Sequence, residues 1–247
     1  MNAIILAAGK GSRLLPLTTH TPKPLVKVGG QPIIERQIEF LLARDVSEIY
    51  IVTGYMHERF SYLKEKYGVH LVYNDAYEQC NNIYSLWLCR EYLYETYIIE
   101  GDVYLNKNFL QQHLTGSAYF TGIKQDIARE WVIEFDNHVY NIINGNLTEL
   151  GEARCNAGDY IMSGISFWNA EATAFIKKEL TDRITAYLSG VAPDIGNQYW
   201  DQIVIDNILL LHIAVIKIAS DDWFEVDKID DLKLAENNRI TSVVTLK

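Results

Sequence analysis

The first half of the chain alternates between short apolar runs and longer segments with helical periodicity. The apolar runs, which read as buried strands, are Ala3–Ala7, Glu48–Thr53, Val69–Tyr73 and Tyr97–Glu100. Pro32–Arg44 carries isoleucines and leucines at helical spacing, and residues 57–67 and 82–92 also read as helices. Strands separated by helices predict a mostly parallel sheet with its ligand site at the carboxyl ends of the strands.

After about residue 115 the pattern changes to aromatic segments typical of strands. These segments are Ala118–Ile123, Trp131–Asp136, Ile161–Trp168 and Ala214–Ala219, with helical patterns over residues 172–188 and 199–212. Residues 228–247 fit either a closing helix with a short strand or a dimer contact, so the oligomeric state is left open. Since no linker or repeat interrupts the chain, we expect a single domain, 1–247, made of two parts, 1–115 and 116–247.

Composition narrows the possible partners. Of 247 residues, 49% are hydrophobic and 22% charged, and the net charge is −10. This acidic balance argues against a nucleic-acid partner, because phosphate backbones are held by clustered Lys and Arg. No apolar stretch is long enough to cross a bilayer, and the N-terminal run lacks the basic flank of a signal peptide. With three cysteines and no CxxC spacing, we expect a cytoplasmic protein without a membrane partner.

The segment LAAGKGSRLLPLTTHTPKPL begins at the end of the first apolar run and carries candidate chemistry. Gly9 and Gly11 let a loop backbone approach phosphate groups, Arg13 can bind phosphate oxygens in a bidentate manner, and Lys23 adds a point charge. A GxG alone is more often a simple turn, and its spacing matches neither GxGxxG nor GxxxxGK[ST]. The combination with Arg13 and the TPKPL segment favours a phosphate site.

Carboxylates at two places could hold a metal ion. Asp102 ends the fourth apolar run, where a side chain enters the crevice beside the sheet. Glu225 and Asp227 stand two residues apart in an extended segment and therefore face the same side. Such acids are often only turn or surface residues, but oxygen ligands beside phosphates suit Mg²⁺. Glu100 is left undecided as a ligand.

Two further groups of residues have both a structural and a functional interpretation. Asn82 and Ser85, at a predicted helix start, either cap the helix or bind the edge of a base. Glu130–Trp131 and Tyr199–Trp200–Asp201 combine rings with carboxylates, which is core packing or a site for a quaternary ammonium. Trp168 is expected in the core.

These motifs and their order resemble the sugar-phosphate nucleotidylyltransferase family, and NNIYSL, EW and YWD resemble its bacterial choline-phosphate cytidylyltransferase branch. The resemblance implies an α/β, Rossmann-like three-layer sandwich (GT-A-like) with a mostly parallel mixed sheet and a small β-rich acceptor-binding portion. It also implies that Lys23, Arg13 and Asp102 are catalytic and that Mg²⁺ is held by Asp102, Asp227 and Glu225. The implied nucleotide contacts are Leu6, Ala7, Ala8, Gly9, Gly11, Ser12, Arg13, Lys23, Asn82, Ser85 and Gly101. The implied acceptor contacts are Trp131, Glu130, Tyr199, Trp200 and Asp201.

The resemblance therefore implies a cytidylyltransferase that forms CDP-choline and pyrophosphate from CTP and phosphocholine. Residues 1–115 would bind the nucleotide and residues 116–247 the acceptor. Three alternatives remain. The same chemistry could act on 2-aminoethylphosphonate or another phosphorylated amine, or on a sugar 1-phosphate, or the chain could be a non-catalytic nucleotide sensor. The residues alone do not separate cytosine from uracil or thymine.

Overall fold

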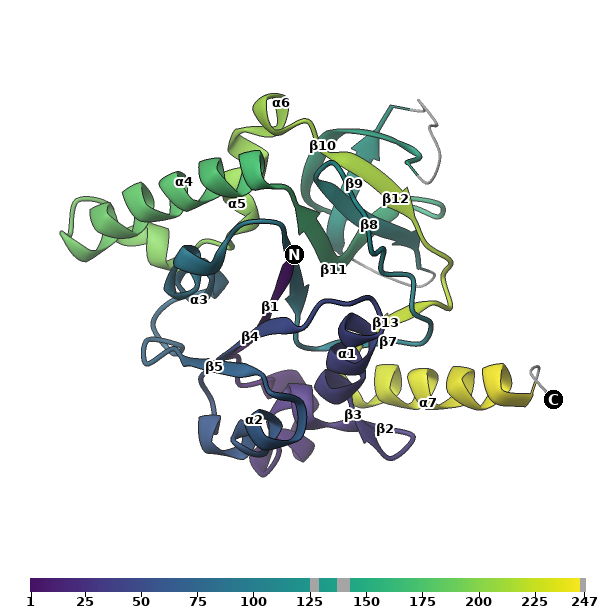
Figure 1. Ribbon diagram of the computed structural model, residues 1–247. Coiled ribbons are helices and arrows are strands. Elements are labelled where there is room, and N and C mark those ends of the chain that lie inside the picture. Colours follow the sequence, from purple (N-terminus) through teal and green to yellow (C-terminus); the bar gives the residue numbers. More distant parts are fainter. Residues whose placement is uncertain (125–128, 137–142, 245–247) are drawn as a thin grey trace.

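The fold is a mixed nine-stranded sheet with helices on both faces. The structure, a computed structural model, describes residues 1–124, 129–136 and 143–244 (Figure 1). The strand order is β5-β4-β1-β6-β11-β8-β12-β10-β9. This arrangement confirms the predicted α/β three-layer sandwich.

The nucleotide half predicted from sequence forms the parallel part of the sheet. Its strands are β1 (Asn2–Ala7), β4 (Glu48–Thr53), β5 (His70–Tyr73) and β6 (Thr96–Glu100). β1 lies between β4 and β6 and is parallel to both, with Leu6 opposite Val52 and Glu100. Because all three strands run the same way, their carboxyl ends meet at one edge of the sheet.

Alternate residues of β1 face the two helical layers. Ile5 packs in one core cluster with Ile38 of α1 (Ile33–Leu42) and Leu63 of α2 (Tyr62–Tyr67). Its neighbour Ile4 packs in the other cluster with α3 (Asn82–Leu88) and α4 (Ala170–Leu188). Since β1 is buried on both faces, its sequence is continuously apolar, as parallel strands require. Figure 1 shows α1 and α2 on one side of the sheet and α3 and α4 on the other.

The second half extends the sheet with mainly antiparallel strands. β11 (Tyr160–Trp168) joins β6, and is followed across the sheet by β8 (Ala118–Ile123), β12 (Ala214–Lys217), β10 (Gly145–Ala153) and β9 (Glu130–Phe135). β9 also pairs with β11, at Val132 and Ile161, so this end of the sheet folds over. The sequence did not predict β10, because its exposed positions carry polar and charged residues instead of an apolar run.

A two-stranded sheet outside the main one joins the two halves near the predicted acids. β7 (Val103–Leu105) pairs antiparallel with β13 (Trp223–Glu225), which places Glu225 opposite Val103. Asp102 directly precedes β7, so this pairing brings it toward Glu225 and Asp227, more than a hundred residues later in the chain. The next helix is α7 (Ile229–Val244), which runs outward from the body (Figure 1). Residues 245–247 of the predicted terminal segment lie outside the described residues.

Three predicted helices are interrupted. Residues 57–67 form η4 (His57–Phe60) and α2, and the segment after residue 82 forms α3 and η5 (Arg90–Tyr92). The segment 199–212 forms α5 (Asp201–Asp206) and α6 (Ile208–Leu211), separated at Asn207, whose φ of −132° is not helical. Short elements complete the fold: η1 (Ser12–Leu14), η2 (Leu17–Thr19), η3 (Lys23–Leu25), β2 (Lys27–Val28), β3 (Gln31–Pro32) and η6 (Pro193–Asn197). No helix of the described chain is long and apolar enough to span a membrane.

Candidate active site

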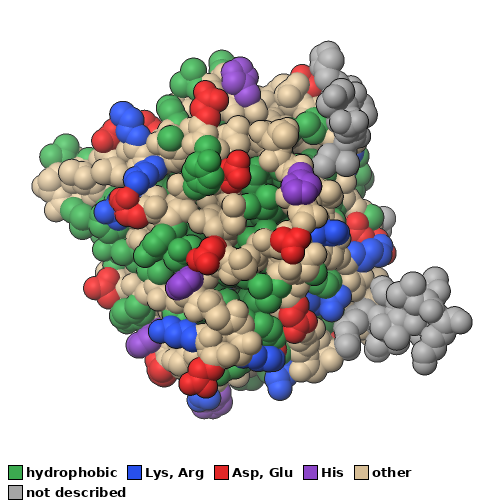
Figure 2. Space-filling view, in the orientation of Figure 1, with side chains coloured by type: hydrophobic (Ala, Val, Ile, Leu, Met, Phe, Trp, Pro, Cys, Tyr) green, Lys and Arg blue, Asp and Glu red, His purple; other side chains and the backbone are tan. Residues whose placement is uncertain are grey.

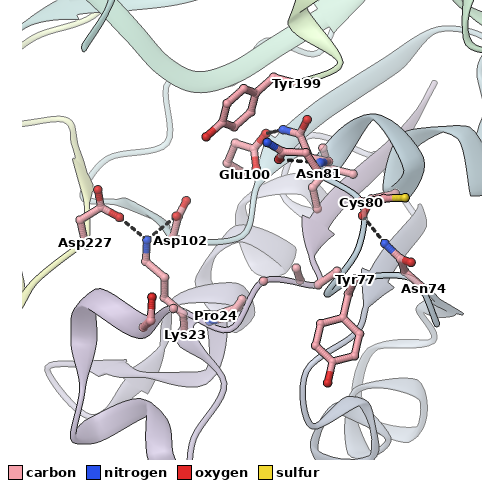
Figure 3. Close-up of a pocket in the computed structure, with 18 of the residues that line it drawn as sticks. Lys23, Pro24, Asn74, Tyr77, Cys80, Asn81, Glu100, Asp102, Tyr199 and Asp227 are labelled. Atoms are coloured by element: carbon pink, nitrogen blue, oxygen red, sulfur yellow. Dashed lines mark hydrogen bonds and ion pairs between the residues drawn. The ribbon is translucent and has the colours of Figure 1, made fainter. Parts of the chain in front are cut away.

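A cavity of about 300 Å³ lies at the carboxyl ends of the parallel strands (Figure 3). Its lining comes from the N-terminal loop, from the segment between β5 and α3, from the end of β6, and from the second half of the chain through Tyr199 and Asp227. The lining residues are Leu6, Ala7, Ala8, Gly9, Gly11, Ser12, Arg13, Lys23, Pro24, Asn74, Tyr77, Cys80, Asn81, Asn82, Ser85, Glu100, Asp102, Tyr199 and Asp227. The structure thus brings together every predicted nucleotide contact except Gly101.

Gly101 has a packing role. Its N–H donates to the Leu6 carbonyl over 2.9 Å, and a Cβ atom there would lie 2.9 Å from the same oxygen and 3.0 Å from Pro24 Cγ. The absence of a side chain lets the end of β6 approach the end of β1. The prediction that Gly101 contacts the nucleotide is not supported, because it does not line the cavity.

Gly11 is required by the shape of the N-terminal loop. Its φ is +62°, and a Cβ atom would lie 2.8 Å from Lys23 Cβ, so a larger residue would be strained and would collide with the lysine. Thr18 holds the loop from the other side, donating its hydroxyl to the Gly11 carbonyl over 2.9 Å. The glycine therefore allows Lys23 to pack directly under the loop.

Lys23 is a buried cation between two carboxylates. Its side chain is 10% exposed, and its Nζ donates to Asp102 Oδ2 over 2.5 Å and to Asp227 Oδ1. Burial by itself lowers the pKa of Lys23, but the charges of Asp102 and Asp227 outweigh it and raise that pKa above the ordinary value. The ammonium group therefore stays charged. Figure 3 shows it between the two aspartates.

Arg13 is a second cation that binds Asp227. Its Nη1 lies 2.7 Å from Asp227 Oδ2, while 72% of its side chain is exposed. An exposed arginine of this kind has room to leave Asp227 for an incoming phosphate, and its planar guanidinium suits that ligand.

Three carboxylates form a group able to hold a divalent cation. Ligand oxygens of Asp102, Glu225 and Asp227 all lie within 4.8 Å of one another. Burial and the charges of Asp102 and Asp227 raise the pKa of Glu225 well above its usual range, as crowding of like charges does. A converging set of hard oxygen donors with excess negative charge fits a divalent cation. The predicted metal residues are therefore brought together.

Glu100 lies outside this group. Its Oε1 accepts a hydrogen bond of 3.0 Å from Asn82 Nδ2, and it faces the cavity. Burial and the nearby charges of Asp102 and Asp201 raise its pKa well above the ordinary value. Its bond to Asn82 makes it a partner of that amide.

The opposite side of the cavity is lined by neutral polar groups. Asn74 is fully buried and donates its Nδ2 to Ser85 Oγ over 2.9 Å. Asn81 caps α3, accepting from the Asn82 N–H over 2.7 Å, so capping falls to Asn81 and leaves Asn82 to other contacts. Five further lining residues were not predicted as site residues: Pro24, Asn74, Tyr77, Cys80 and Asn81. Asn74 could have been found, since it directly follows a predicted parallel strand.

Two of the predicted acceptor aromatics face each other. The rings of Trp131 and Tyr199 meet edge to face with centroids 5.7 Å apart, and Tyr199 is 47% exposed at the cavity. Glu130 precedes Trp131, and its pKa is raised by burial and by the charge of Asp227. Neither Glu130 nor Trp131 lines the cavity itself.

The other two predicted acceptor residues are buried away from the cavity. Trp200 is 2% exposed and packs edge to face on Trp168, which is in the core as expected. Asp201 is 4% exposed and accepts a hydrogen bond of 2.7 Å from the Tyr119 hydroxyl. Burial raises the pKa of Asp201 to about 6. The prediction that Trp200 forms a pocket wall is wrong, and Asp201 is not at the cavity surface.

Comparison with known proteins agrees with this geometry. Residues 2–232 match the family model described as nucleotidyl transferase. The choline-phosphate cytidylyltransferase of Streptococcus pneumoniae is 43% identical over 96% of this chain and 97% of its own length. The enzyme of that name from Haemophilus influenzae is 38% identical over 94% of each chain.

Among solved structures, the CTP:phosphocholine cytidylyltransferase of Streptococcus pneumoniae superposes with a TM-score of 0.84 at 41% identity. The match covers 96% of this chain and 97% of that one. The chain thus belongs to the nucleotidyl transferase family, in its choline-phosphate cytidylyltransferase branch.

Proposed function

We propose that this chain is a cytidylyltransferase that converts CTP and phosphocholine to CDP-choline and pyrophosphate. The observation that carries the proposal is the convergence of Lys23, Asp102 and Asp227 at one cavity in a chain 43% identical to a choline-phosphate cytidylyltransferase. A buried cation and paired acids are the groups that nucleotidyl transfer needs, because charge builds up on the phosphate oxygens.

In the proposed reaction a phosphate oxygen of phosphocholine attacks the α-phosphorus of CTP in line. The new P–O bond forms as the bond from the α-phosphorus to the β-phosphate oxygen breaks, and pyrophosphate leaves. The acceptor phosphate is already ionised near neutral pH, so no protein nucleophile is needed. Lys23 and Arg13, which bind Asp102 and Asp227 without nucleotide, would turn to the α-phosphate and the leaving phosphates. The Gly9–Gly11 loop would hold the triphosphate.

We further propose that Asp102, Glu225 and Asp227 hold Mg²⁺. When bound, this ion supplies positive charge to the phosphate oxygens beside the attacked phosphorus. All three carboxylates must be ionised to bind it. Residues 1–115 would then bind the nucleotide and 116–247 the acceptor, although Glu225 and Asp227 of the second half serve the metal.

For the acceptor, we propose that the quaternary ammonium lies against Trp131 and Tyr199. Aromatic faces attract such cations by up to about 2 kcal/mol when water is excluded. Glu130, which directly precedes Trp131 in the sequence, would supply negative charge. The nucleotide would contact Leu6, Ala7, Ala8, Ser12 and Ser85.

No nucleic-acid or membrane partner is proposed, and the oligomeric state is left open. On the face in Figure 2, acidic and basic side chains are interspersed, without the broad basic area that a nucleic acid would need. A cytoplasmic location remains a prediction from the cysteine content.

The test is a pyrophosphate-release assay across CTP, UTP and dTTP, each with phosphocholine, phosphoethanolamine, 2-aminoethylphosphonate or glucose 1-phosphate. We expect the highest kcat/KM for CTP with phosphocholine. A higher kcat/KM with 2-aminoethylphosphonate or phosphoethanolamine would identify a primary amine as the acceptor. A higher kcat/KM with glucose 1-phosphate would identify a sugar 1-phosphate as the acceptor. Tight CTP binding without turnover of any acceptor would support a nucleotide sensor.

A further inference from the structure

The start of α3 is fastened to the loop that carries Tyr199. Asn81 donates its backbone N–H to the Gly196 carbonyl over 2.7 Å and its side-chain amide to the Asn197 carbonyl over 3.3 Å. Asn82 accepts a hydrogen bond of 2.8 Å at Oδ1 from the backbone N–H of Trp200. The segment that lines the nucleotide side of the cavity thus binds the segment that lines its acceptor side.

Asn82 has a second partner at the end of β6. Its Nδ2 donates to Glu100 Oε1 over 3.0 Å, while Oδ1 accepts from Trp200. Both ends of the amide therefore bind protein groups, and its orientation is fixed by one donor and one acceptor. An amide engaged at both ends is poorly placed to select a base, which requires its donor and acceptor together.

These contacts fix the peptide that joins Tyr199 to Trp200. The Trp200 ring is held in the core against Trp168, with centroids 5.6 Å apart, and its backbone N–H is held by Asn82. With both the ring and the N–H of residue 200 anchored, the preceding Tyr199 is directed toward the cavity, where its ring meets Trp131. The burial of Trp200, which removes it as a pocket wall, gives it this anchoring role.

We infer that Asn82, held by Glu100, is a positioning residue that sets the acceptor site through the Trp200 N–H and Tyr199. The inference rests on the proposed function. It assigns a role to the hydrogen bonds of Asn82 with Glu100 and Trp200, which connect the two halves of the chain. It implies that changing Asn82 affects binding of the quaternary-ammonium acceptor more than binding of the nucleotide.

The test compares Asn82→Leu, which keeps the side-chain size and removes both hydrogen bonds, with Ser85→Ala, which changes a cavity residue one turn later in α3 that binds Asn74. For Asn82→Leu we expect the KM of phosphocholine to rise about tenfold, the effect of losing two ordinary hydrogen bonds, with the KM of CTP changed less than about twofold. For Ser85→Ala we expect the reverse pattern. Asn82→Asp, which keeps the acceptor for Trp200, should show a smaller rise, and it serves if Asn82→Leu does not fold.

A double variant separates positioning from general damage. Because Asn82 acts through Tyr199, the effects of Asn82→Leu and Tyr199→Ala on the KM of phosphocholine should be clearly less than additive. Additive effects of the two substitutions, or a rise only in the KM of CTP, would overturn the inference about Asn82. Either result would leave the proposed function intact, provided that the wild type forms CDP-choline. A wild-type chain that forms no CDP-choline would refute the proposed function itself, and with it this role of Asn82.

Discussion

Replacing Lys23 with methionine removes the positive charge between Asp102 and Asp227 and keeps most of the side chain. Removing one partner of a buried ion pair costs about 3–5 kcal/mol. The carboxylates at this site keep 24% and 18% of their side-chain area exposed, so water screens part of the repulsion left behind. We therefore expect a loss of about 2 kcal/mol, which lowers the Tm of a chain of this size by roughly 4–8 °C.

The same substitution should change the response to Mg²⁺. In the wild type without nucleotide, Lys23 and Arg13 both compete with a metal ion for Asp227. In Lys23→Met, much of that competition is gone, so Mg²⁺ should restore most of the lost stability, since saturation to 100 times Kd contributes about 2.7 kcal/mol. In the wild type, Mg²⁺ alone should change the Tm little, and Mg²⁺ with CTP should raise it clearly.

Thermal unfolding with and without Mg²⁺ and CTP measures these shifts. Lys64→Met, which changes an exposed lysine of α2, is the matched control and should behave as the wild type. Activity of Lys23→Met should fall by a factor of about 100–1,000, as when one group that stabilises transition-state charge is lost. The reasoning is refuted if Lys23→Met is as stable as the wild type without Mg²⁺, or gains no more from Mg²⁺ than the wild type does.

Two further substitutions test the buried acid and the acceptor pocket. The pKa of Asp201, about 6 in the folded protein, exceeds the value of about 3.9 for an unfolded aspartate, so stability is full at low pH and is lost as pH rises through 6. Asp201→Asn avoids that loss, and in urea unfolding its advantage over the wild type should be larger at pH 8 than at pH 4.5 by up to about 2 kcal/mol; a pH-independent difference would contradict this. Trp131→Ala should raise the KM of phosphocholine about tenfold through loss of cation–π attraction, and in steady-state kinetics an equal rise for CTP would show that Trp131 acts only in folding.

The strands of the first half were predictable because β1, β4 and β6 are mostly buried on both faces, while β5, at the edge of the sheet, still carries adjacent Leu71 and Val72. Glu48–Thr53 was predicted with its observed bounds, and the other three parallel strands within a residue or so at either end. Such strands are continuous apolar runs. β10 could not be found in this way, because it carries glutamate and threonine at its exposed positions and Gly145 and Gly151 near its ends.

The metal and phosphate residues were predictable for a related reason. Lys23 and Asp102 each belong to a short motif that comes after a buried strand. Each was therefore expected at the carboxyl end of the sheet. Their partner Asp227 is more than a hundred residues away from Asp102, so only the resemblance to a family, and then the β7–β13 pairing, connects the two.

The acceptor side shows what a linear sequence cannot provide. Tyr199 and Trp200 are adjacent rings, and either could face the cavity. Which one does depends on the backbone at the start of α5 and on Trp168, to which the buried ring packs. The same backbone direction buries Asp201 against Tyr119, so the predicted acceptor contact is an internal residue.

The central claim, that this chain joins CMP to phosphocholine, is tested most directly by following the phosphorus atoms. The purified chain would be incubated with CTP, phosphocholine and Mg²⁺ and its products identified by ³¹P NMR. We predict that the diphosphate diester of CDP-choline and free pyrophosphate appear in equal amounts, and only when acceptor and metal are both present. Release of CMP or orthophosphate without CDP-choline, or unchanged CTP in the complete mixture, would contradict the account.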